Sequence, residues 1–190
     1  MGTLQELIDS YSPDDWGTGK PFERACKWLL THDPVYASQI ARVWLWDDWP
    51  DRWGPDTGID LVAETHEGEF WAIQAKAYAA TNRVTKADAD SFLSESNREW
   101  TVGKAKQQFA FRLLIATTDG AGPNIRRVVK GQEKPASLVR RNDLEAKALD
   151  WSSDVDGPSP PPRAPQYPVV SDGVRSGSVA HRVRHAFTCA

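Results

Sequence analysis

Gly58-Ile59-Asp60-Leu61-Val62-Ala63 is followed, after a short polar segment, by Phe70-Trp71-Ala72-Ile73-Gln74-Ala75-Lys76, and these two runs decide how the chain folds. Both runs contain β-prone residues over the length of a strand, and the segment between them contains one glycine, Gly68. This pattern predicts a β-hairpin.

The length of the hairpin loop decides which side chains share a face of the sheet. A three-residue loop that ends at Gly68, with this glycine in the left-handed conformation that such loops require, pairs Asp60 with Gln74. Side chains alternate along a strand, so Lys76 is expected on the same face as both. A two-residue loop would instead oppose Asp60 to Ala75 and would split the three polar side chains across the sheet. The three-residue loop is our prediction.

Asp60, Gln74 and Lys76 interrupt otherwise apolar strands, and buried charges are costly unless they are paired, hydrogen-bonded or bound to a metal. We therefore expect these side chains to have a function. The Asp60 carboxylate and the Gln74 side-chain oxygen are ligands of the kind that Mg²⁺ prefers. Lys76 would then lie beside an attacking water and stabilise the charge that develops on a phosphate, which suits metal-assisted phosphodiester cleavage. The spacing alone leaves an alternative open, in which Asp60 and Lys76 form an ordinary ion pair on a surface hairpin.

Several motifs, in this order, resemble those of a known nuclease family. They are Lys20-Pro21-Phe22-Glu23, Val43-Trp44-Leu45-Trp46-Asp47-Asp48-Trp49-Pro50, Gly58-Ile59-Asp60-Leu61-Val62-Ala63, Gln74-Ala75-Lys76 and Val84-Thr85-Lys86-Ala87-Asp88. Residues 1–151 resemble the Mrr-like nuclease module that begins type ISP restriction-modification enzymes and related nuclease-helicase proteins. The resemblance implies the PD-(D/E)XK fold, an α/β restriction-endonuclease-like fold in which helices flank a mixed central sheet.

The resemblance also implies a site and its chemistry. Asp60, Gln74, Lys76 and Glu23 would be the catalytic residues, and Asp60, Gln74 and Glu23 would hold Mg²⁺, for which Mn²⁺ can substitute. The glutamine before the lysine is this branch's own variation of the motif. Without the resemblance, Glu23 looks like a solvated or capping acid in the first turn of a helix.

The N-terminal part of the chain is predicted to be helical and then extended. Thr3 and Glu6 form a capping box for a short helix, which ends near a turn at residues 12–15. Pro21 fits the first turn of a second helix, and residues 42–46 are predicted to be extended. The second helix has an apolar stripe at helical spacing, made by Phe22, Ala25, Cys26, Leu29 and Leu30.

Helices and strands alternate after the hairpin. Thr85 caps a predicted helix, with apolar contacts along the stretch to about Trp100. Residues 112–118 and 136–139 are predicted strands with a helix between them, and Asn142 caps a last helix. The order helix, strand, hairpin, helix, strand, helix, strand, helix predicts a mixed sheet flanked by helices.

Two groups of basic side chains are candidates for contact with DNA. Lys86 lies in the first turn of its helix, where the helix dipole disfavours a cation, and this suggests a use such as phosphate contact. The alternative is a free surface lysine. Arg126, Arg127 and Lys130 could likewise face DNA, or could simply be solvated.

The tryptophans between the second helix and the hairpin have two interpretations. Aromatic rings can stack on unpaired bases, but the charged residues of the segment that contains these rings are mostly acidic, with Arg52 as its single basic residue, so packing between elements is the prediction. The residues concerned are Trp44, Trp46, Trp49 and Trp53.

Composition limits the class of protein. The chain has 190 residues and a formal net charge of −3, which argues against tight DNA binding by the domain alone. It contains neither an apolar run of about eighteen residues nor an N-terminal leader, so we expect a cytoplasmic protein without a membrane partner. Its two cysteines, Cys26 and Cys189, belong to no Cys/His cluster, so any metal should have oxygen ligands.

Residues 152–190 differ from the rest of the chain. They contain six of the thirteen prolines and no tryptophan or lysine, so we expect a Pro-rich linker and a disordered tail after a nuclease domain at residues 1–151.

These observations lead to two functional hypotheses. The first is a Mg²⁺-dependent DNA endonuclease module of a restriction or defence system, which in its relatives works with a helicase or translocase module. Cutting both strands would need two active sites, and hence a dimer or paired complexes. The alternative is a catalytically idle DNA-binding or interaction remnant of a truncated nuclease-helicase protein.

Overall fold

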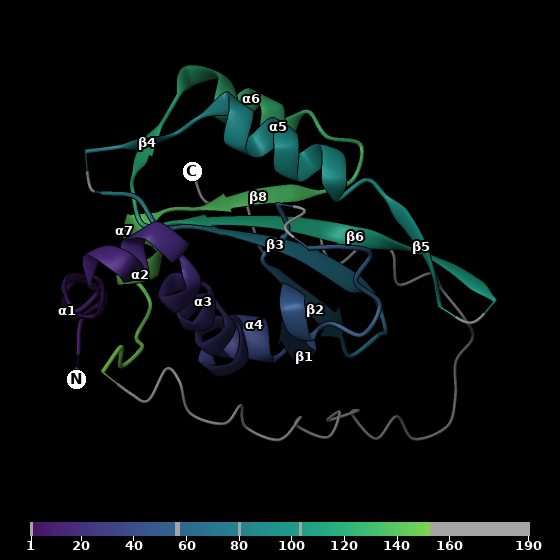
Figure 1. Cartoon of the computed structure of the whole chain (residues 1–190), viewed down its shortest axis with the longest axis horizontal. Helices are drawn as coiled ribbons and strands as arrows, with labels where there is room; N and C mark the ends of the chain where they lie inside the picture. Colours follow the sequence, from purple (N-terminus) through teal and green to yellow (C-terminus); the bar gives the residue numbers. More distant parts are fainter. Residues whose placement is uncertain (1, 56–57, 80, 103, 153–190) are drawn as a thin grey trace, which may run out of the picture.

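A mixed β-sheet forms the centre of the molecule (Figure 1). The computed structural model describes residues 2–55, 58–79, 81–102 and 104–152, and within them the six strands run in the order β1-β2-β3-β6-β5, with β8 pairing on β6. β2 pairs antiparallel with both β1 and β3, and β5 pairs antiparallel with β6, whereas β6 pairs in parallel with both β3 and β8. The strands are β1 (Ile40–Leu45), β2 (Leu61–Thr65), β3 (Phe70–Lys76), β5 (Glu99–Val102), β6 (Ala105–Ala116) and β8 (Ala136–Val139).

The hairpin between β2 and β3 has the predicted loop. The ladder runs from Leu61 opposite Ile73 to Glu64 opposite Phe70. The Thr65 N–H then donates to the carbonyl oxygen of Glu69 at 2.8 Å, and Gly68 has a φ of 80°. The three-residue loop and its left-handed glycine are therefore confirmed.

Helices cover both faces of the sheet (Figure 1). One layer contains α1 (Leu4–Asp9), α2 (Pro13–Thr18), α3 (Lys20–His32) and α4 (Pro34–Ala37), and the other contains α5 (Lys86–Glu95) and α6 (Pro123–Lys130). The remaining elements are the 3-10 turn η1 (Trp46–Asp48), the short α7 (Arg141–Glu145), and β4 (Arg83–Val84) paired in parallel with β7 (Gly120–Ala121). The predicted α/β class and mixed sheet are confirmed.

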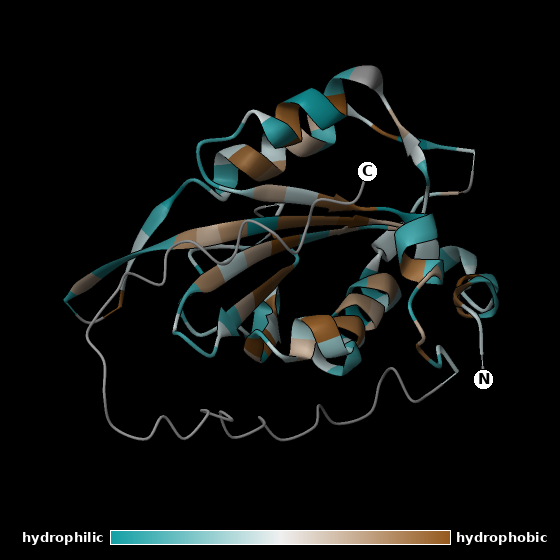
Figure 2. Cartoon of the chain, turned by 180° about the vertical axis from the view of Figure 1, so that it is seen from behind, coloured by the Kyte–Doolittle hydropathy of each residue, from teal (hydrophilic) through white to brown (hydrophobic). Residues whose placement is uncertain are grey.

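Each face of the sheet has its own hydrophobic core, because successive strand residues point to opposite sides. The core under α1 and α3 contains Leu61 and Ile73 of the hairpin, together with the predicted apolar stripe of α3. The core under α5 and α6 contains Val62 and Ala72. Figure 2 shows hydrophobic segments, in brown, along the central strands and on the helices that cover them.

Two predictions in the first half of the chain need correction or confirmation. The turn expected at residues 12–15 is wrong, because Ser12 and Asp15 form a second capping box and start α2. The packing prediction for the tryptophans is confirmed. Trp49 is 2% exposed, and its ring lies 5.4 Å from that of Trp46 and 5.1 Å from that of Trp100.

The predicted helix up to Trp100 is too long. α5 ends at Glu95, and Trp100 belongs to β5, where its ring lies 4.6 Å from that of Phe109. β6 starts at Ala105 and not at Arg112, since its first part extends beyond the main sheet and pairs with β5. This part is largely solvent-exposed and polar, so it carries no apolar strand signal.

The last predicted helix also differs from the structure. α7 starts at Arg141 and ends at Glu145, and its capping acid is Asp143, which accepts the Arg140 N–H at 2.8 Å. Asn142 does not cap it, because Arg140 holds the N-cap position and Asn142 lies inside the first turn, where its N–H donates to the Asp119 carboxylate. In the described part of the chain, no helix has the length and apolar character needed to cross a bilayer. The predicted tail lies outside the described residues from 153 onward.

Candidate active site

The topology brings the predicted site residues to one edge of the sheet. β2 is antiparallel to β3, so Asp60, which directly precedes β2, lies near the carboxyl end of β3. Lys76 is the last residue of β3, and Gln74 lies two residues before it. Glu23 is in the first turn of α3, which packs against this part of the sheet.

Asp60 is held by three hydrogen bonds to the backbone. Its N–H donates to the carbonyl oxygen of Ile73 at 2.9 Å, and its carbonyl oxygen accepts the Trp46 N–H at 2.8 Å. Its Oδ2 accepts the N–H of Ala75 at 2.7 Å. Because Ala75 lies between Gln74 and Lys76, this last bond fixes the carboxylate against the Gln74-Ala75-Lys76 run.

The predicted sharing of one face is correct for Gln74 and Lys76 but wrong for Asp60. Gln74 and Lys76 line the same cleft, whereas Asp60 does not line it. The regular ladder ends at Leu61, and the Asp60 N–H bonds to Ile73 and not to Gln74. Side-chain alternation therefore breaks at Asp60, whose electrostatic neighbours include Glu23 of α3 as well as Lys76.

The surroundings of Asp60 disfavour its charge. Burial raises the pKa of Asp60 to about 6, and the nearby Glu23 carboxylate adds to this rise. The Ala75 N–H opposes it, as do the positive charges of Lys76 and Lys20. A carboxyl group with such a pKa gains from a bound cation, which would compensate the charge that burial penalises.

Glu23 is buried, so its interpretation as a solvated acid is wrong. It is 6% exposed, and its carboxylate forms an ion pair with Lys20 at 3.0 Å. The Lys20 ammonium also lies 3.4 Å from the exposed carboxylate of Asp47. Burial raises the pKa of the neighbouring Cys26 thiol, and the charges of Asp60 and Glu23 raise it further. The two carboxylates thus act on the same buried region beside α3.

Gln74 has a fixed amide and an unpartnered oxygen. Its side chain is 2% exposed, and Nε2 donates to the carbonyl oxygen of Gly58 at 2.8 Å. This bond orients the amide. Oε1 is buried without a hydrogen-bond partner among the described residues. An unmade hydrogen bond of this kind costs about 1–3 kcal/mol, and a cation at this oxygen would remove the cost.

Gln74 and Lys76 line a cleft of about 520 Å³ between β3 and α5. Its other lining residues are Gly58, Ala87, Asp88, Ser91 and Glu95. Asp88 is the third residue of α5 and forms its capping box with Thr85. Its Oδ2 also accepts the Tyr78 hydroxyl at 2.7 Å, and this contact could be found only from the folded chain.

Lys86, the predicted phosphate contact, lies on the exposed surface of α5. Its ammonium forms an ion pair with Asp90, one turn further along the helix. The surface-lysine alternative is thus favoured by its present contacts, and its role in DNA binding stays a prediction.

The candidate ligands near this edge are all oxygen atoms, with Asp60 and Glu23 beside α3 and Gln74 in the cleft under α5. No group of three or more His, Cys, Asp or Glu side chains in the described residues is placed to hold a metal. The available ligands are the carboxylates of Asp60 and Glu23 and the unpartnered oxygen of Gln74, and all of these are oxygen atoms. Oxygen ligands suit Mg²⁺ and Mn²⁺ better than they suit softer metals.

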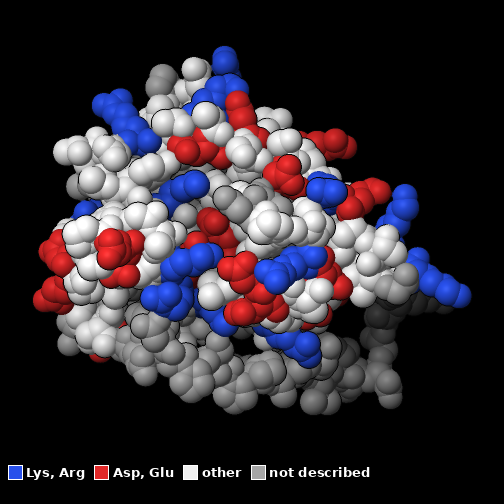
Figure 3. Space-filling model, in the orientation of Figure 1, with Lys and Arg blue, Asp and Glu red and all other residues white. Residues whose placement is uncertain are grey.

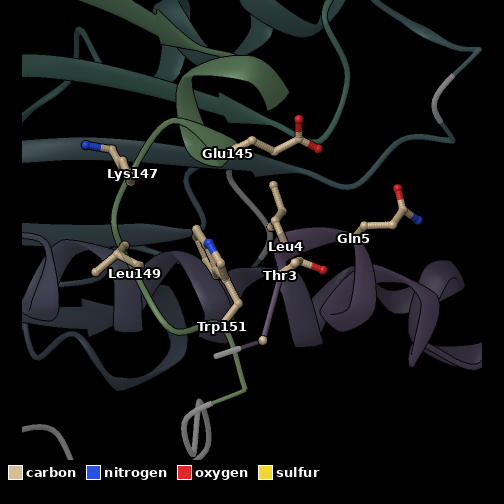
Figure 4. A pocket seen from close by; sticks show the side chains of 8 residues that line it. Thr3, Leu4, Gln5, Glu145, Lys147, Leu149 and Trp151 are labelled. Atoms are coloured by element: carbon tan, nitrogen blue, oxygen red, sulfur yellow. The ribbon is translucent and has the colours of Figure 1, made fainter.

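A second cavity, of about 510 Å³, lies between α1 and the end of the described chain (Figure 4). Its lining includes Leu4, Lys147 and Trp151, and none of the predicted site residues. Lys147 is engaged elsewhere, because its ammonium lies 3.0 Å from the buried Asp33 carboxylate and 4.7 Å from the centre of the Tyr36 ring. This cavity therefore belongs to the packing of the N-terminal and C-terminal segments.

Comparison with known proteins identifies the family. The sequence model of an Mrr-type restriction endonuclease family matches residues 31–158, which include Asp60, Gln74 and Lys76 but not Glu23. Among solved structures, the ATP-dependent type ISP restriction-modification enzyme LlaBIII bound to DNA is 31% identical, with a TM-score of 0.61. The match covers 80% of this chain and 9% of LlaBIII.

Two further structures are more distant. The DNA modification-dependent restriction endonuclease AspBHI is 19% identical over 74% of this chain and 33% of its own, with a TM-score of 0.48. The MspJI restriction endonuclease in complex with a 27-mer oligonucleotide is 15% identical over 80% of this chain and 33% of its own, with a TM-score of 0.45. A search of curated proteins finds no match. Since the family model matches more than half of the sequence, the chain belongs to the restriction endonuclease family.

Proposed function

We infer that this domain is a divalent-metal-dependent DNA endonuclease of a restriction or defence system, which hydrolyses phosphodiester bonds. The observation that carries the proposal is the 2.7 Å hydrogen bond from the Ala75 N–H to the Asp60 carboxylate. It holds an acid against the Gln74-Ala75-Lys76 run at the end of β3. Membership of the restriction endonuclease family supports the same reaction.

The proposed ligands of Mg²⁺ are Asp60, Glu23 and the Oε1 atom of Gln74, with Mn²⁺ as a substitute. When bound, such an ion lowers the pKa of the attacking water and polarises the phosphate. Asp60 must be ionised to bind it. The Ala75 N–H orients the Asp60 carboxylate, and the bond to Gly58 orients the Gln74 amide.

The proposed role of Lys76 is to act on the reacting groups. Its ammonium has no ion-pair partner within the described residues, although Asp60 and Asp88 both experience its charge. A lysine in this state is available to orient the attacking water and to stabilise negative charge on the phosphate.

The substrate and partners are proposed by analogy. LlaBIII, of which this chain matches a small part, is described as bound to DNA and as a restriction-modification enzyme. The sequence resemblance adds a helicase or translocase module as a partner. Cleavage of both strands would require a dimer or two converging complexes, because each chain has one proposed site.

Nicking of supercoiled plasmid in Mg²⁺ or Mn²⁺ tests the proposal. Asp60→Asn and Lys76→Ala should each lower the rate by about 100-fold or more, as expected for groups acting at the reacting atoms. The matched controls Asp14→Asn and Lys106→Ala, which alter exposed residues, should keep the parent rate. Activity that survives both site substitutions would refute the site, and an inactive parent would favour the idle remnant.

A further inference from the structure

Four basic residues form an exposed group near α6, which we name the basic rim: Arg83 of β4, and Arg126, Arg127 and Lys130 of α6. The chain has more acids than bases, with 26 Asp and Glu against 23 Lys and Arg. Even so, residues 120–132 contain the three basic residues of α6 and no acid. The rim is therefore a local positive region on a net-negative chain.

The charges of the basic rim are uncompensated. None of its four side chains has an ion pair or hydrogen bond with any described residue. Lys20 and Lys86, by contrast, are exposed cations with partners, since Lys20 pairs with Glu23 and Lys86 pairs with Asp90. The rim residues are free to bind an anion without breaking an internal contact.

The rim also has no role in packing α6. The helix contacts the core through Ile125 and Val129, which are buried. Arg126 and Lys130 are four residues apart, and like charges at this spacing destabilise a helix. Arg127 and Lys130 lie in the last turn of α6, where the helix dipole favours a cation. None of the three side chains makes a contact inside the described part of the chain that would explain its place on the exposed face, which points to an external partner.

The topology places Arg83 and the N-terminal part of α6 at the edge of the sheet that holds the candidate active site, and Lys130 follows in the last turn of the helix. β3, β6 and β8 are parallel, so their carboxyl ends lie together. β7 and α6 follow directly from the carboxyl end of β6, and Arg83 pairs with Gly120 of β7. Basic side chains stand at the upper left of Figure 3, over the region where β4 and the start of α6 lie in Figure 1.

We propose that the basic rim binds the phosphate backbone of duplex DNA and holds it beside the candidate active site. This inference rests on the proposed function, from which DNA is taken as the ligand of the rim. Arginine suits this ligand because its planar donor groups match phosphate oxygens. Neutralising several phosphates releases counterions, and this gain lets a local cluster bind DNA although the whole chain is negatively charged.

Fluorescence anisotropy of a labelled duplex, measured in EDTA with the full chain, tests the rim without cleavage. Replacing Arg126, Arg127 and Lys130 together by Gln should weaken binding about tenfold or more near 0.1 M salt. The slope of log K against log salt concentration should become less steep by about 2–3. Arg83→Gln alone should cause a smaller loss and a slope change of about 1.

The control variant must remove the same number of positive charges as the triple rim variant. Arg42, Lys104 and Lys106 are exposed and lie on β1 and at the start of β6, away from the carboxyl ends of the parallel strands. Their joint replacement by Gln should change the affinity less than twofold. An equal loss in both triple variants would overturn the proposal, as would a parent that binds no duplex or a rim variant that binds normally. Circular dichroism should confirm that every variant remains folded.

The same measurements separate this inference from the nuclease function. Rim-dependent binding by a parent that never nicks DNA would support the rim and refute the nuclease. If the parent nicks DNA and the rim variant binds and nicks equally well, the nuclease function is supported and the proposed role of the rim is refuted.

Discussion

At the scale of single residues, the site contains side chains whose burial costs stability in the domain by itself. Asp60 is a partly buried acid near a second carboxylate, and Gln74 has a buried oxygen without a partner. Both states would be relieved by a cation. This gives two predictions in which stability, and not catalysis, is measured.

The first concerns pH. Because the pKa of Asp60 is raised from 3.8 to about 6, ionisation of this group destabilises the fold as the pH rises between these values, and the cost remains above pH 6. In EDTA, Asp60→Asn should therefore gain about 2–3 kcal/mol relative to the parent between pH 4 and pH 7. Asparagine keeps an acceptor for the Ala75 N–H. Urea unfolding over this pH range is the measurement, and Asp14→Asn should show no comparable gain.

The second concerns the unpartnered oxygen of Gln74. Gln74→Glu adds a carboxylate but removes the donor to Gly58, so in EDTA it should lose about 1–3 kcal/mol of stability. Added Mn²⁺ should raise its melting temperature more than that of the parent, because a metal bound only to the folded state stabilises it. Gln39→Glu is a suitable control, since Gln39 also donates to a backbone carbonyl. An equal response of the two variants to Mn²⁺ would contradict the role of Gln74.

At the scale of elements, α5 connects helix capping to the cleft. Thr85 and Asp88 form its capping box, and the first two turns of α5 supply Ala87, Asp88 and Ser91 to the cleft. α1 has the same type of box, made by Thr3 and Glu6, but its residues do not line that cleft. Removing each capping box in turn therefore separates an effect on stability, which both should have, from an effect on activity, which only the box of α5 should have.

Thr85→Ala and Thr3→Ala should each cost about 1 kcal/mol of stability, because each removes a side-chain acceptor for a helix N–H. Only Thr85→Ala should also slow plasmid nicking, since it loosens the start of α5 beside Gln74 and Lys76. Urea unfolding and the nicking assay are measured on the same samples. If both variants nick at the parent rate, α5 does not shape the site.

At the scale of the whole molecule, aromatic packing joins parts of the chain that are distant in sequence. Trp49 follows η1, and its ring contacts those of Trp100 in β5 and Phe109 in β6. This cluster fixes the β5–β6 extension against the loop that leads into the Asp60 segment. Its role is structural, and a stability measurement can distinguish it from base stacking.

Trp49→Ala should cost about 3–5 kcal/mol, as is usual when a large aromatic side chain is removed from a core. In a sample that remains folded at low temperature, duplex binding in EDTA should stay close to that of the parent. Trp49→Phe should cost less, because it keeps part of the ring contacts, and it serves if the alanine variant is unfolded. A loss of binding without a loss of stability would instead indicate base stacking.

Local sequence determined the hairpin, its register and the amphipathic face of α3, because turn chemistry and side-chain periodicity act over a few neighbouring residues. Gly68 specified the loop, and with it the ladder that ends at Leu61 and Ile73. Only the tertiary structure decided that Asp60 leaves this ladder to accept the Ala75 N–H and that Glu23 is buried beside Lys20. The cleft between Gln74 and α5 was likewise decided there. These features depend on contacts between residues far apart in the chain, which no local pattern records.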